Sequence, residues 1–452
     1  MLVVLSDLHF TDGTAGEHNL QAETLSRVIL SDWMTLAARV RAVELRVVLL
    51  GDILDLVRTE RWFDLPSEHR PWGRDGLAVL AGDGAGSPLE RCCLGILGRM
   101  PADGRRESAS ATSILAKNWA ALALLRELPR RAAEALGRPL PVSVEFIPGN
   151  HDRLADAFPA VRAAVREMLG AATSGAGAPD APFPRECRAP AYGLLARHGH
   201  AFDPWNAGGP GAAPAVGDVI TTEFAVKLPW TLDRRRDRHP AVSAEWLRGL
   251  REIDNVRPLG RIMEWLDSRI RTESLPEIRA ALEEAFETVT AGLLEIDFLR
   301  TWRDDATEWD EAVRWLTSPW IRWLPRKALE ILRAQDLFPL FLKASEDNPD
   351  PSGDALIEGL LDERAWVDDP EIRYLALGHT HNPLVLPLEC RAGRDVVYIN
   401  AGTWRERLVR TAGSGAPAFV PLKHTSYAVF YQRGEGDAEA PRFDFRSAIH
   451  PA

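Results

Sequence analysis

The sequence predicts an α/β fold, because short apolar runs that end in polar clusters alternate with segments of helical spacing. Residues 2–5, 46–50 and 142–147 have the composition of buried strands. Residues 17–43 carry apolar side chains at helical spacing between the first two runs. Polar clusters follow these runs at Asp7, Asp52 and Asn150. Since open α/β sheets bind ligands at the carboxyl ends of their strands, these clusters are candidate site segments.

A long helical stretch occupies the later half of the chain. From about residue 220 to 345 the pattern is helical throughout, and this stretch holds 8 of the 15 tryptophans. We expect an inserted all-α subdomain whose tryptophans pack between helices; the alternative is an apolar groove for a lipid or nucleobase. Strand character returns at 372–377, 385–388, 396–399 and 427–431, which predicts that the end of the chain rejoins the sheets.

The composition limits location and partners. Of 452 residues, 46% are hydrophobic and 26% are charged, and no apolar run approaches the roughly 20 residues that span a bilayer. The start of the chain lacks a basic segment and meets a charge at Asp7, so we expect a first strand of a cytoplasmic protein and not a signal peptide. The formal net charge of −11 argues against broad electrostatic binding of nucleic acid or anionic lipid.

Five short motifs follow apolar segments and hold 6 of the 11 histidines. They are Asp7-Leu8-His9, Gly51-Asp52-Ile53-Leu54-Asp55, Gly149-Asn150-His151-Asp152, His198-Gly199-His200 and Gly378-His379-Thr380-His381. The motifs offer oxygen and nitrogen ligands without cysteine. Such ligands suit Mn²⁺, Fe or Zn²⁺, and poorly suit Cu(I) or iron–sulfur clusters.

The order and spelling of these motifs resemble the calcineurin-like metallophosphoesterase superfamily. Its signature runs DxH, GDxxD, GNHD or GNHE, a His near a Gly, and GHxH, and every element is present here in that order from residue 7 to residue 381. The resemblance implies a four-layer α-β-β-α sandwich of two mixed sheets, with a dimetal site at one edge. It also implies a core in two parts, 1–219 (with an insertion at about 61–137) and 346–452. Residues 220–345 would then be a helical lid or specificity insertion.

The ligand set is carried over from the resemblance, position by position. One metal would be held by Asp7, His9 and His381, and the other by Asn150, His198 and His379. Asp52 would bridge both, because two cations about 3.5–4 Å apart need a shared anion to offset their repulsion. Two divalent ions are therefore expected, Mn²⁺ first, with Fe and Zn²⁺ as alternatives.

The third motif supplies the residues that the resemblance assigns to catalysis. His151 would donate a proton to the leaving-group oxygen, and Asp152 would orient its imidazole and favour the charged form. Asp55 is expected to fix a ligand histidine or the local turn. Arg153 is a candidate for contact with a phosphate oxygen.

The fourth motif offers two histidines, and the spelling of the family motif favours the first. We therefore expect His198 to be the ligand and His200 to lie near the substrate or merely to pack.

The reaction that the resemblance implies is hydrolysis of a phosphate ester or pyrophosphate bond by attack of a metal-bridging hydroxide. The motifs look distantly like those of the bacterial UDP-2,3-diacylglucosamine pyrophosphatases, but that group is shorter and lacks so large an insertion, so its substrate is not carried over. One alternative is a DNA or RNA nuclease of the same superfamily, which the acidic balance disfavours. The other is a non-catalytic protein-binding scaffold, which is disfavoured because no expected ligand is missing.

Overall fold

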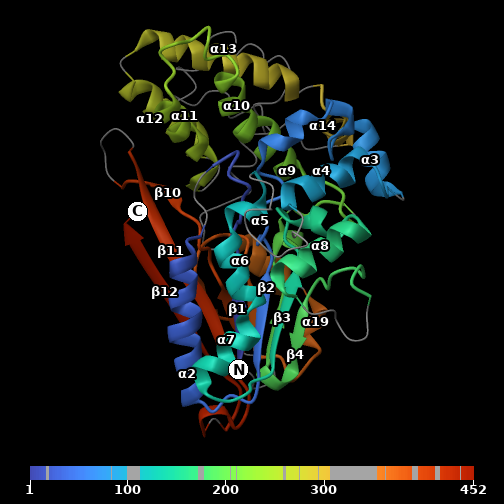
Figure 1. Ribbon diagram of the computed structural model, residues 1–452, viewed down its shortest axis with the longest axis vertical. Coiled ribbons are helices and arrows are strands. Elements are labelled where there is room, and N and C mark those ends of the chain that lie inside the picture. The colour runs from blue at the N-terminus through green and yellow to red at the C-terminus, as the bar shows by residue number, and fades with distance from the viewer. Residues whose placement is uncertain are drawn as a thin grey trace.

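Two mixed β-sheets form the centre of the molecule, and helices cover them (Figure 1). The computed structural model describes residues 1–16, 20–82, 84–98, 112–171, 178–203, 205–209, 211–257, 261–273, 275–293, 295–305, 354–361, 363–388, 395–412, 418–437 and 439–451. The predicted α/β class, with two mixed sheets and a helical insertion, is confirmed within these residues.

The first sheet has the order β3-β2-β1-β11-β10-β6, and β12 pairs with β11. Its strands are β1 (Leu2–Leu5), β2 (Leu45–Leu50), β3 (Val142–Ile147), β6 (Val256–Arg257), β10 (Arg407–Arg410), β11 (Phe419–Tyr431) and β12 (Arg442–Pro451). β1, β2 and β3 are parallel, and β11 runs antiparallel to β1. The carboxyl ends of β1, β2 and β3 therefore meet at one edge of the sheet.

The second sheet has the order β4-β5-β7-β9-β8. Its strands are β4 (Cys187–Ala189), β5 (Leu194–Ala196), β7 (Tyr374–Leu377), β8 (Leu384–Pro387) and β9 (Val397–Asn400). β5, β7 and β9 are parallel, so the segments that follow them also leave at one edge.

Side chains on the two faces of each strand pack the sheets against each other and against the helices. Leu2 and Val4 of β1 lie in an apolar cluster with Leu194 of the second sheet, whereas Val3 and Leu5 face the cluster beneath the helices. Successive residues of a strand point to opposite faces, so β1 is apolar on both sides because both sides are covered. The far face of the second sheet packs in the same way, with Leu375 in a third cluster.

Helices cover the outer faces. Those associated with the first sheet and with the segment between β2 and β3 are α1 (Ala22–Arg27), η1 (Val28–Trp33), α2 (Met34–Arg39), α3 (Arg74–Ala81), α4 (Pro88–Leu97), α5 (Ile114–Lys117), α6 (Trp119–Arg126), α7 (Leu128–Leu136) and α8 (Pro159–Leu169). Short 3₁₀ turns also occur: η2 (Glu60–Asp64), η3 (Ser67–His69), η5 (Arg153–Asp156), η6 (Pro190–Tyr192), η7 (His200–Phe202) and η13 (Glu435–Asp437). α18 (Asp354–Leu361) and α19 (Arg364–Val367) contribute Leu356, Leu360 and Trp366 to the cluster on the second sheet.

The helical insertion is described up to residue 305 and lies at the top of Figure 1, above β1, β2 and β3. Its elements, including the helix that leads into it, are α9 (Val216–Ile220), η8 (Thr221–Val226), α10 (Lys227–Asp233), α11 (Ala244–Leu250), η9 (Arg251–Asn255), α12 (Ile262–Thr272), α13 (Pro276–Leu293) and α14 (Asp297–Asp305). The expectation of a purely helical stretch is wrong at one point, because the two residues of β6 pair with β10. That pairing ties the insertion into the first sheet.

Three tryptophans of the insertion, Trp230, Trp246 and Trp265, contact aromatic or cationic side chains. Trp265 is buried, and Arg269 lies over both its ring and that of Trp246. The ring of Trp230 lies tilted against that of Phe63, with ring centroids 4.7 Å apart. These contacts favour packing over a ligand groove. Trp309, Trp315, Trp320 and Trp323 lie outside the described residues.

Buried polar contacts also hold the insertion on the core. Thr222 donates a hydrogen bond to the carbonyl of Val57 at 2.7 Å. Glu223 is buried and accepts from Arg70 at 2.7 Å and from the Trp72 indole at 2.8 Å. Because a buried carboxylate needs such partners, these contacts fix where the insertion leaves the core.

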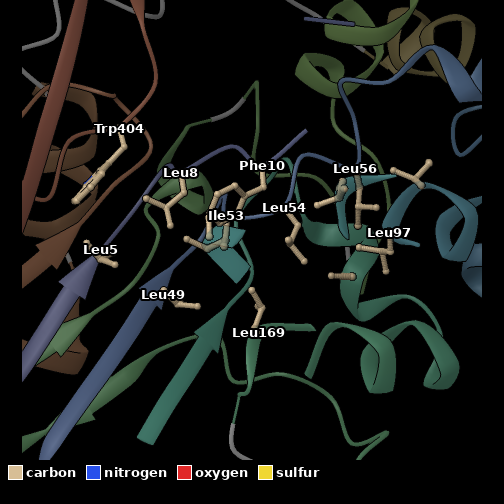
Figure 2. Close-up of a cluster of buried hydrophobic side chains, with 14 of the residues drawn as sticks. Leu5, Leu8, Phe10, Leu49, Ile53, Leu54, Leu56, Leu97, Leu169 and Trp404 are labelled. Atoms are coloured by element: carbon tan, nitrogen blue, oxygen red, sulfur yellow. The ribbon is translucent and has the colours of Figure 1, made fainter. Parts of the chain in front are cut away.

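Buried apolar side chains pack beneath the loops that follow β1 and β2. Figure 2 shows Leu5 and Leu49 at the ends of neighbouring strands, with Leu8, Phe10 and Ile53 in the loops beyond them. All five side chains are at most 1% exposed. The loops are therefore anchored by alternate apolar residues, which leaves the intervening polar residues to face elsewhere.

Among the described residues, no helix combines the length and apolar character that a membrane crossing requires.

Candidate metal centre

The predicted ligands come from the loops that follow five strands. Asp7 and His9 follow β1, Asp52 follows β2, and Asn150 follows β3. In the second sheet, His198 follows β5, and His379 and His381 follow β7. Because β1–β3 are parallel to one another and β5 is parallel to β7, these loops gather at the carboxyl edges of the two facing sheets.

One group of side chains consists of Asp7, His9, Asp52 and His381, all buried. Asp7 Oδ1 lies 3.2 Å from His381 Nε2, and the Nε2 atoms of His9 and His381 are 3.0 Å apart. Asp52 Oδ2 lies 3.9 Å from His9 Nε2. One candidate ligand atom from each residue lies within 4.8 Å of all the others, so this group could hold a metal ion.

A second group consists of Asp52, His198 and His379. Asp52 Oδ2 lies 3.4 Å from His198 Nε2. Asn150 Oδ1 lies 3.2 Å from His198 Nε2 and 3.0 Å from His379 Nδ1, so the predicted amide ligand joins this group. The structure thus brings all seven predicted ligands together, and Asp52 belongs to both groups.

The donor atoms of the first group suit a cation. Asp7 is fully buried, and its Oδ1 makes no hydrogen bond within the described residues. Two imidazole nitrogens only 3.0 Å apart also need a proton or a cation between their lone pairs. Since buried charge is otherwise costly, a bound metal ion would satisfy both features.

The backbone is strained where the ligands lie. Among the described residues, seven that are not glycine have positive φ, and five of them are predicted ligands. These five are Asp7 (55°), His9 (48°), Asp52 (53°), His379 (71°) and His381 (59°). Positive φ in a residue with a Cβ is uncommon, costs of the order of 1–3 kcal/mol, and clusters at functional sites.

Outer contacts decide which histidine nitrogen faces the centre. His9 Nδ1 lies 3.1 Å from Asp55 Oδ2, and His198 Nδ1 lies 2.9 Å from the carbonyl oxygen of Leu50. His379 is turned the other way, because its Nε2 lies 2.8 Å from Asp203 Oδ2. A carboxylate or carbonyl behind a ligand histidine fixes the tautomer and the ring orientation. Asp55 therefore holds the ring of His9, which is a predicted ligand.

Asp203 was not among the residues that the sequence singled out. It follows the fourth motif by three residues, at the end of η7. The available signal was an acidic residue just beyond a motif with two histidines. Sequence spacing did not indicate that this side chain, which follows β5, would reach His379, which follows β7.

The histidines of the site have pKa values shifted in opposite directions. Burial lowers the pKa of His9 to about 4, and burial together with neighbouring arginines holds the pKa of His381 well below its usual value. Burial also disfavours charge on His198, but Asp52 raises its pKa to about 9. The negative field that favours a proton on His198 would equally favour a metal cation, which would displace that proton.

His151 lies beside the first group without being a predicted ligand. Its Nδ1 is 3.0 Å from Asp55 Oδ1, and its ring centroid is 4.8 Å from that of His9. Burial opposes the charged form, yet Asp55 and Asp52 raise the pKa of His151 to about 10. His9, Asp55 and His151 also form a third group with ligand geometry, but Asp55 already joins the two histidines through its two oxygens.

The expected contact between Asp152 and His151 is replaced by the contact to Asp55. Asp152 is fully buried, and its carboxylate accepts backbone hydrogen bonds from Ile53, Leu54 and Gly149. These donors belong to the turns after β2 and β3, so Asp152 ties the two loops together. Burial, with a further contribution from Asp52, raises the pKa of Asp152 to about 7.

The suggestion that Arg153 contacts phosphate is wrong for this structure. The side chain is buried, its Nε lies 3.1 Å from Asp218 Oδ2, and its Nη1 donates to the carbonyl of Ala213 at 2.9 Å. Arg153 is therefore committed to holding the loop before α9.

His200 lies beside the second group, with its ring centroid 5.3 Å from that of His198. It belongs to none of the three groups with ligand geometry. The structure thus places His198 among the candidate ligands and His200 next to them.

Comparison of the sequence with models of known protein families and with curated proteins gave no match. The site is therefore characterised by its own geometry. That geometry is a buried cluster of aspartate and histidine side chains that could hold a metal ion.

Proposed function

We propose that this chain is a calcineurin-like metallophosphoesterase that hydrolyses a phosphate ester or pyrophosphate bond with two divalent metal ions. The observation that carries the proposal is that two ligand groups share the carboxylate of Asp52. A shared carboxylate is what two adjacent cations require. The ordered set of five motifs supports the same reading.

The ligand assignment follows from the two groups. Asp7, His9 and His381 would hold one ion, and Asn150, His198 and His379 the other. Asp52 would touch both. When bound, the two cations would lower the pKa of a water molecule and neutralise phosphate oxygens. With oxygen and nitrogen ligands and no thiolate, Mn²⁺ is the metal that we propose first, ahead of Fe and Zn²⁺.

We assign His151 to proton donation. Its side chain is 12% exposed, whereas those of His9 and His381 are 0% and 4% exposed, so His151 is the more accessible to a substrate. Asp55 holds its Nδ1 and favours the imidazolium, which leaves Nε2 for the leaving-group oxygen. Asp55 is a positioning residue in this scheme, and Asp152 maintains the two loops.

The helical insertion would govern substrate choice. The core would comprise 1–219 and 346–452, and the insertion would touch what lies beyond the reacting phosphate. Support comes from the η9 and β6 segment, which packs against residues before and within β10, close to His381.

The test is metal analysis of the full chain after loading with Mn²⁺, followed by hydrolysis of 4-nitrophenyl phosphate. We expect about two ions per chain and turnover that a chelator abolishes and added Mn²⁺ restores. Trace metal content after loading would overturn the proposal. Full metal content without turnover of phosphomonoesters, phosphodiesters, pyrophosphates or DNA would instead favour the binding-scaffold alternative.

A further inference from the structure

Four arginine side chains lie close together beside the candidate metal centre, three of them around one carboxylate. They are Arg58 after β2, Arg257 in β6, Arg405 before β10 and Arg407 in β10, and together they form what we call the arginine cluster. Arg58 and Arg405 are 1% exposed and Arg407 is 6% exposed. Guanidinium groups are rarely buried without a paired anion.

Asp254 is the carboxylate within this cluster. It lies 2.8 Å from Arg405 Nη2 and 3.2 Å from Arg58 Nε, and its backbone carbonyl accepts from Arg257 Nη1 at 2.7 Å. Asp55 and Glu252 also act on Arg58 electrostatically. The pKa of Arg257 is lowered to about 9, first by burial and then by the neighbouring Arg405, Arg407 and Arg58. Asp254 raises this pKa but does not offset the lowering. Positive charge therefore exceeds negative charge where these side chains meet.

Two donors of the cluster are unused. Arg405 Nη1 and Arg407 Nε are buried and have no hydrogen-bond partner among the described residues. Buried donors are normally satisfied, and charged donors especially so. The planar fork of a guanidinium matches the oxygens of a phosphate, which can accept from several arginines at once. An anion with several oxygens would supply both the missing charge and the missing acceptors.

The cluster adjoins the half of the centre that contains His9 and His381. Arg407 Nη1 donates to the backbone carbonyl of His381 at 2.9 Å. Asp254 is close enough to His151 to raise the pKa of that imidazole. The unused donors therefore lie on the side of the centre where His151 would meet the leaving group.

We propose that the arginine cluster binds a second phosphate group of the substrate, the one that departs as the leaving group. The inference rests on the proposed hydrolase function and makes a phosphoric anhydride the substrate class. The oxygen of water bonds to one phosphorus as the water releases a proton to the solvent, and the bond from that phosphorus to the bridging oxygen breaks. The departing phosphate keeps the electron pair, and the arginines offset its charge.

The first experiment needs neither metal nor turnover. Binding of inorganic pyrophosphate to chelator-treated full-length protein is measured by calorimetry, for the native chain and for Arg407→Gln, Arg405→Gln and Arg410→Gln. Arg410 is the matched control, because it lies in the same strand but pairs with Glu264 at 2.6 Å and is 35% exposed. We expect the first two variants to weaken binding roughly 10- to 100-fold each, and the control to bind like the native chain.

The second experiment uses the Mn²⁺-loaded protein. The ratio of kcat/KM for P1,P2-diphenyl pyrophosphate to that for phenyl phosphate should fall about 10- to 100-fold in Arg407→Gln, and stay unchanged in the control. A native chain that does not bind pyrophosphate, or folded variants at Arg405 and Arg407 that bind it as the native chain does, would overturn the proposal. Arg407→Lys, which keeps the charge, serves if the glutamine variants do not fold; affinity equal to that of the native chain would again count against the cluster. Binding through the arginines without any hydrolysis would retain the anion site and refute the proposed function.

Discussion

The two halves of the candidate metal centre differ in the charges that surround them. Asp7, His9 and His381 are buried, and arginines lie close to His381. His198 and His379 instead face carboxylates, Asp52 and Asp203 respectively. The first half therefore combines carboxylates, those of Asp7, Asp52 and Asp55, with neighbouring arginines, whereas the two histidines of the second half lie against Asp52 and Asp203.

The difference separates two tasks within one site. In the second half, Asp52 and Asp203 would favour a bound cation, so that half is suited to holding an ion. In the first half, carboxylates would favour a cation while the neighbouring arginines would attract an anion, so that half is suited to binding an anion beside a metal ion. The ring of His381 is also less well satisfied, because its Nδ1 atom is buried without a hydrogen-bond partner in the described part of the chain.

The largest effect is expected from Asp52→Ala, because Asp52 belongs to both halves. Loss of the shared carboxylate should empty both metal positions, since two adjacent cations would then repel each other without compensation. Metal content is measured by mass spectrometry after Mn²⁺ loading, with circular dichroism to confirm folding. Full occupancy in this variant would refute the shared-ligand model.

The next effect concerns His151, which lies against the first half without holding its metal. His151→Ala should lower kcat on an aryl phosphate roughly 10²–10⁴-fold while the metal content stays native. Rates are compared for substrates with good and poor leaving groups, because a lost proton donor matters most for a poor one. Loss of metal would instead make His151 a ligand.

A pair of variants tests the halves separately. Asp55→Asn removes the charge behind His9, and Asp203→Asn removes the charge behind His379. Each should weaken one of two Mn²⁺ binding steps by about 10–100-fold and leave the other step nearly native. Calorimetric titration resolves the steps. If both variants weakened the same step, the assignment of ligands to halves would be wrong.

The smallest effect is expected at His200. Its side chain lies beside His198 but outside the groups with ligand geometry. His200→Ala should therefore change Mn²⁺ affinity by less than about tenfold, below the effect of an outer contact that fixes a ligand. His198→Ala is the comparison and should abolish the second binding step. The reverse ranking would identify His200 as the ligand.

Much of the fold could be predicted because its signals are local. β1, β2 and β3 are short apolar runs that end in turns, and β7 and β9 read in the same way. β6 could not be predicted, because a strand of two residues inside a helical stretch has no period and depends on its partner β10. Residues 113–136 form three short helices, α5, α6 and α7, which Asn118 and Glu127 separate.

The candidate ligands were predictable from motifs, whereas their surroundings were not. Asp203, Asp254 and Arg405 belong to no motif; Asp203 lies just beyond the fourth motif, whereas the fold brings Asp254 and Arg405 to the site from segments far from the motifs in the sequence. The misassigned role of Asp152 has a similar cause. Its position next to His151 suggested a contact between the two side chains. Instead, the carboxylate accepts hydrogen bonds from backbone N–H groups of two turns.

The positive φ angles of the ligand residues have a consequence for any search for more robust variants. Glycine relieves the backbone strain at such positions, so Asp7→Gly, Asp52→Gly or His379→Gly would remove strain, and Asp7→Gly would also remove a buried carboxylate oxygen that has no hydrogen bond among the described residues. Selection for heat resistance alone is therefore expected to favour substitutions that destroy the centre. At these positions, stability of the fold favours glycine, whereas metal binding would require the aspartate or histidine.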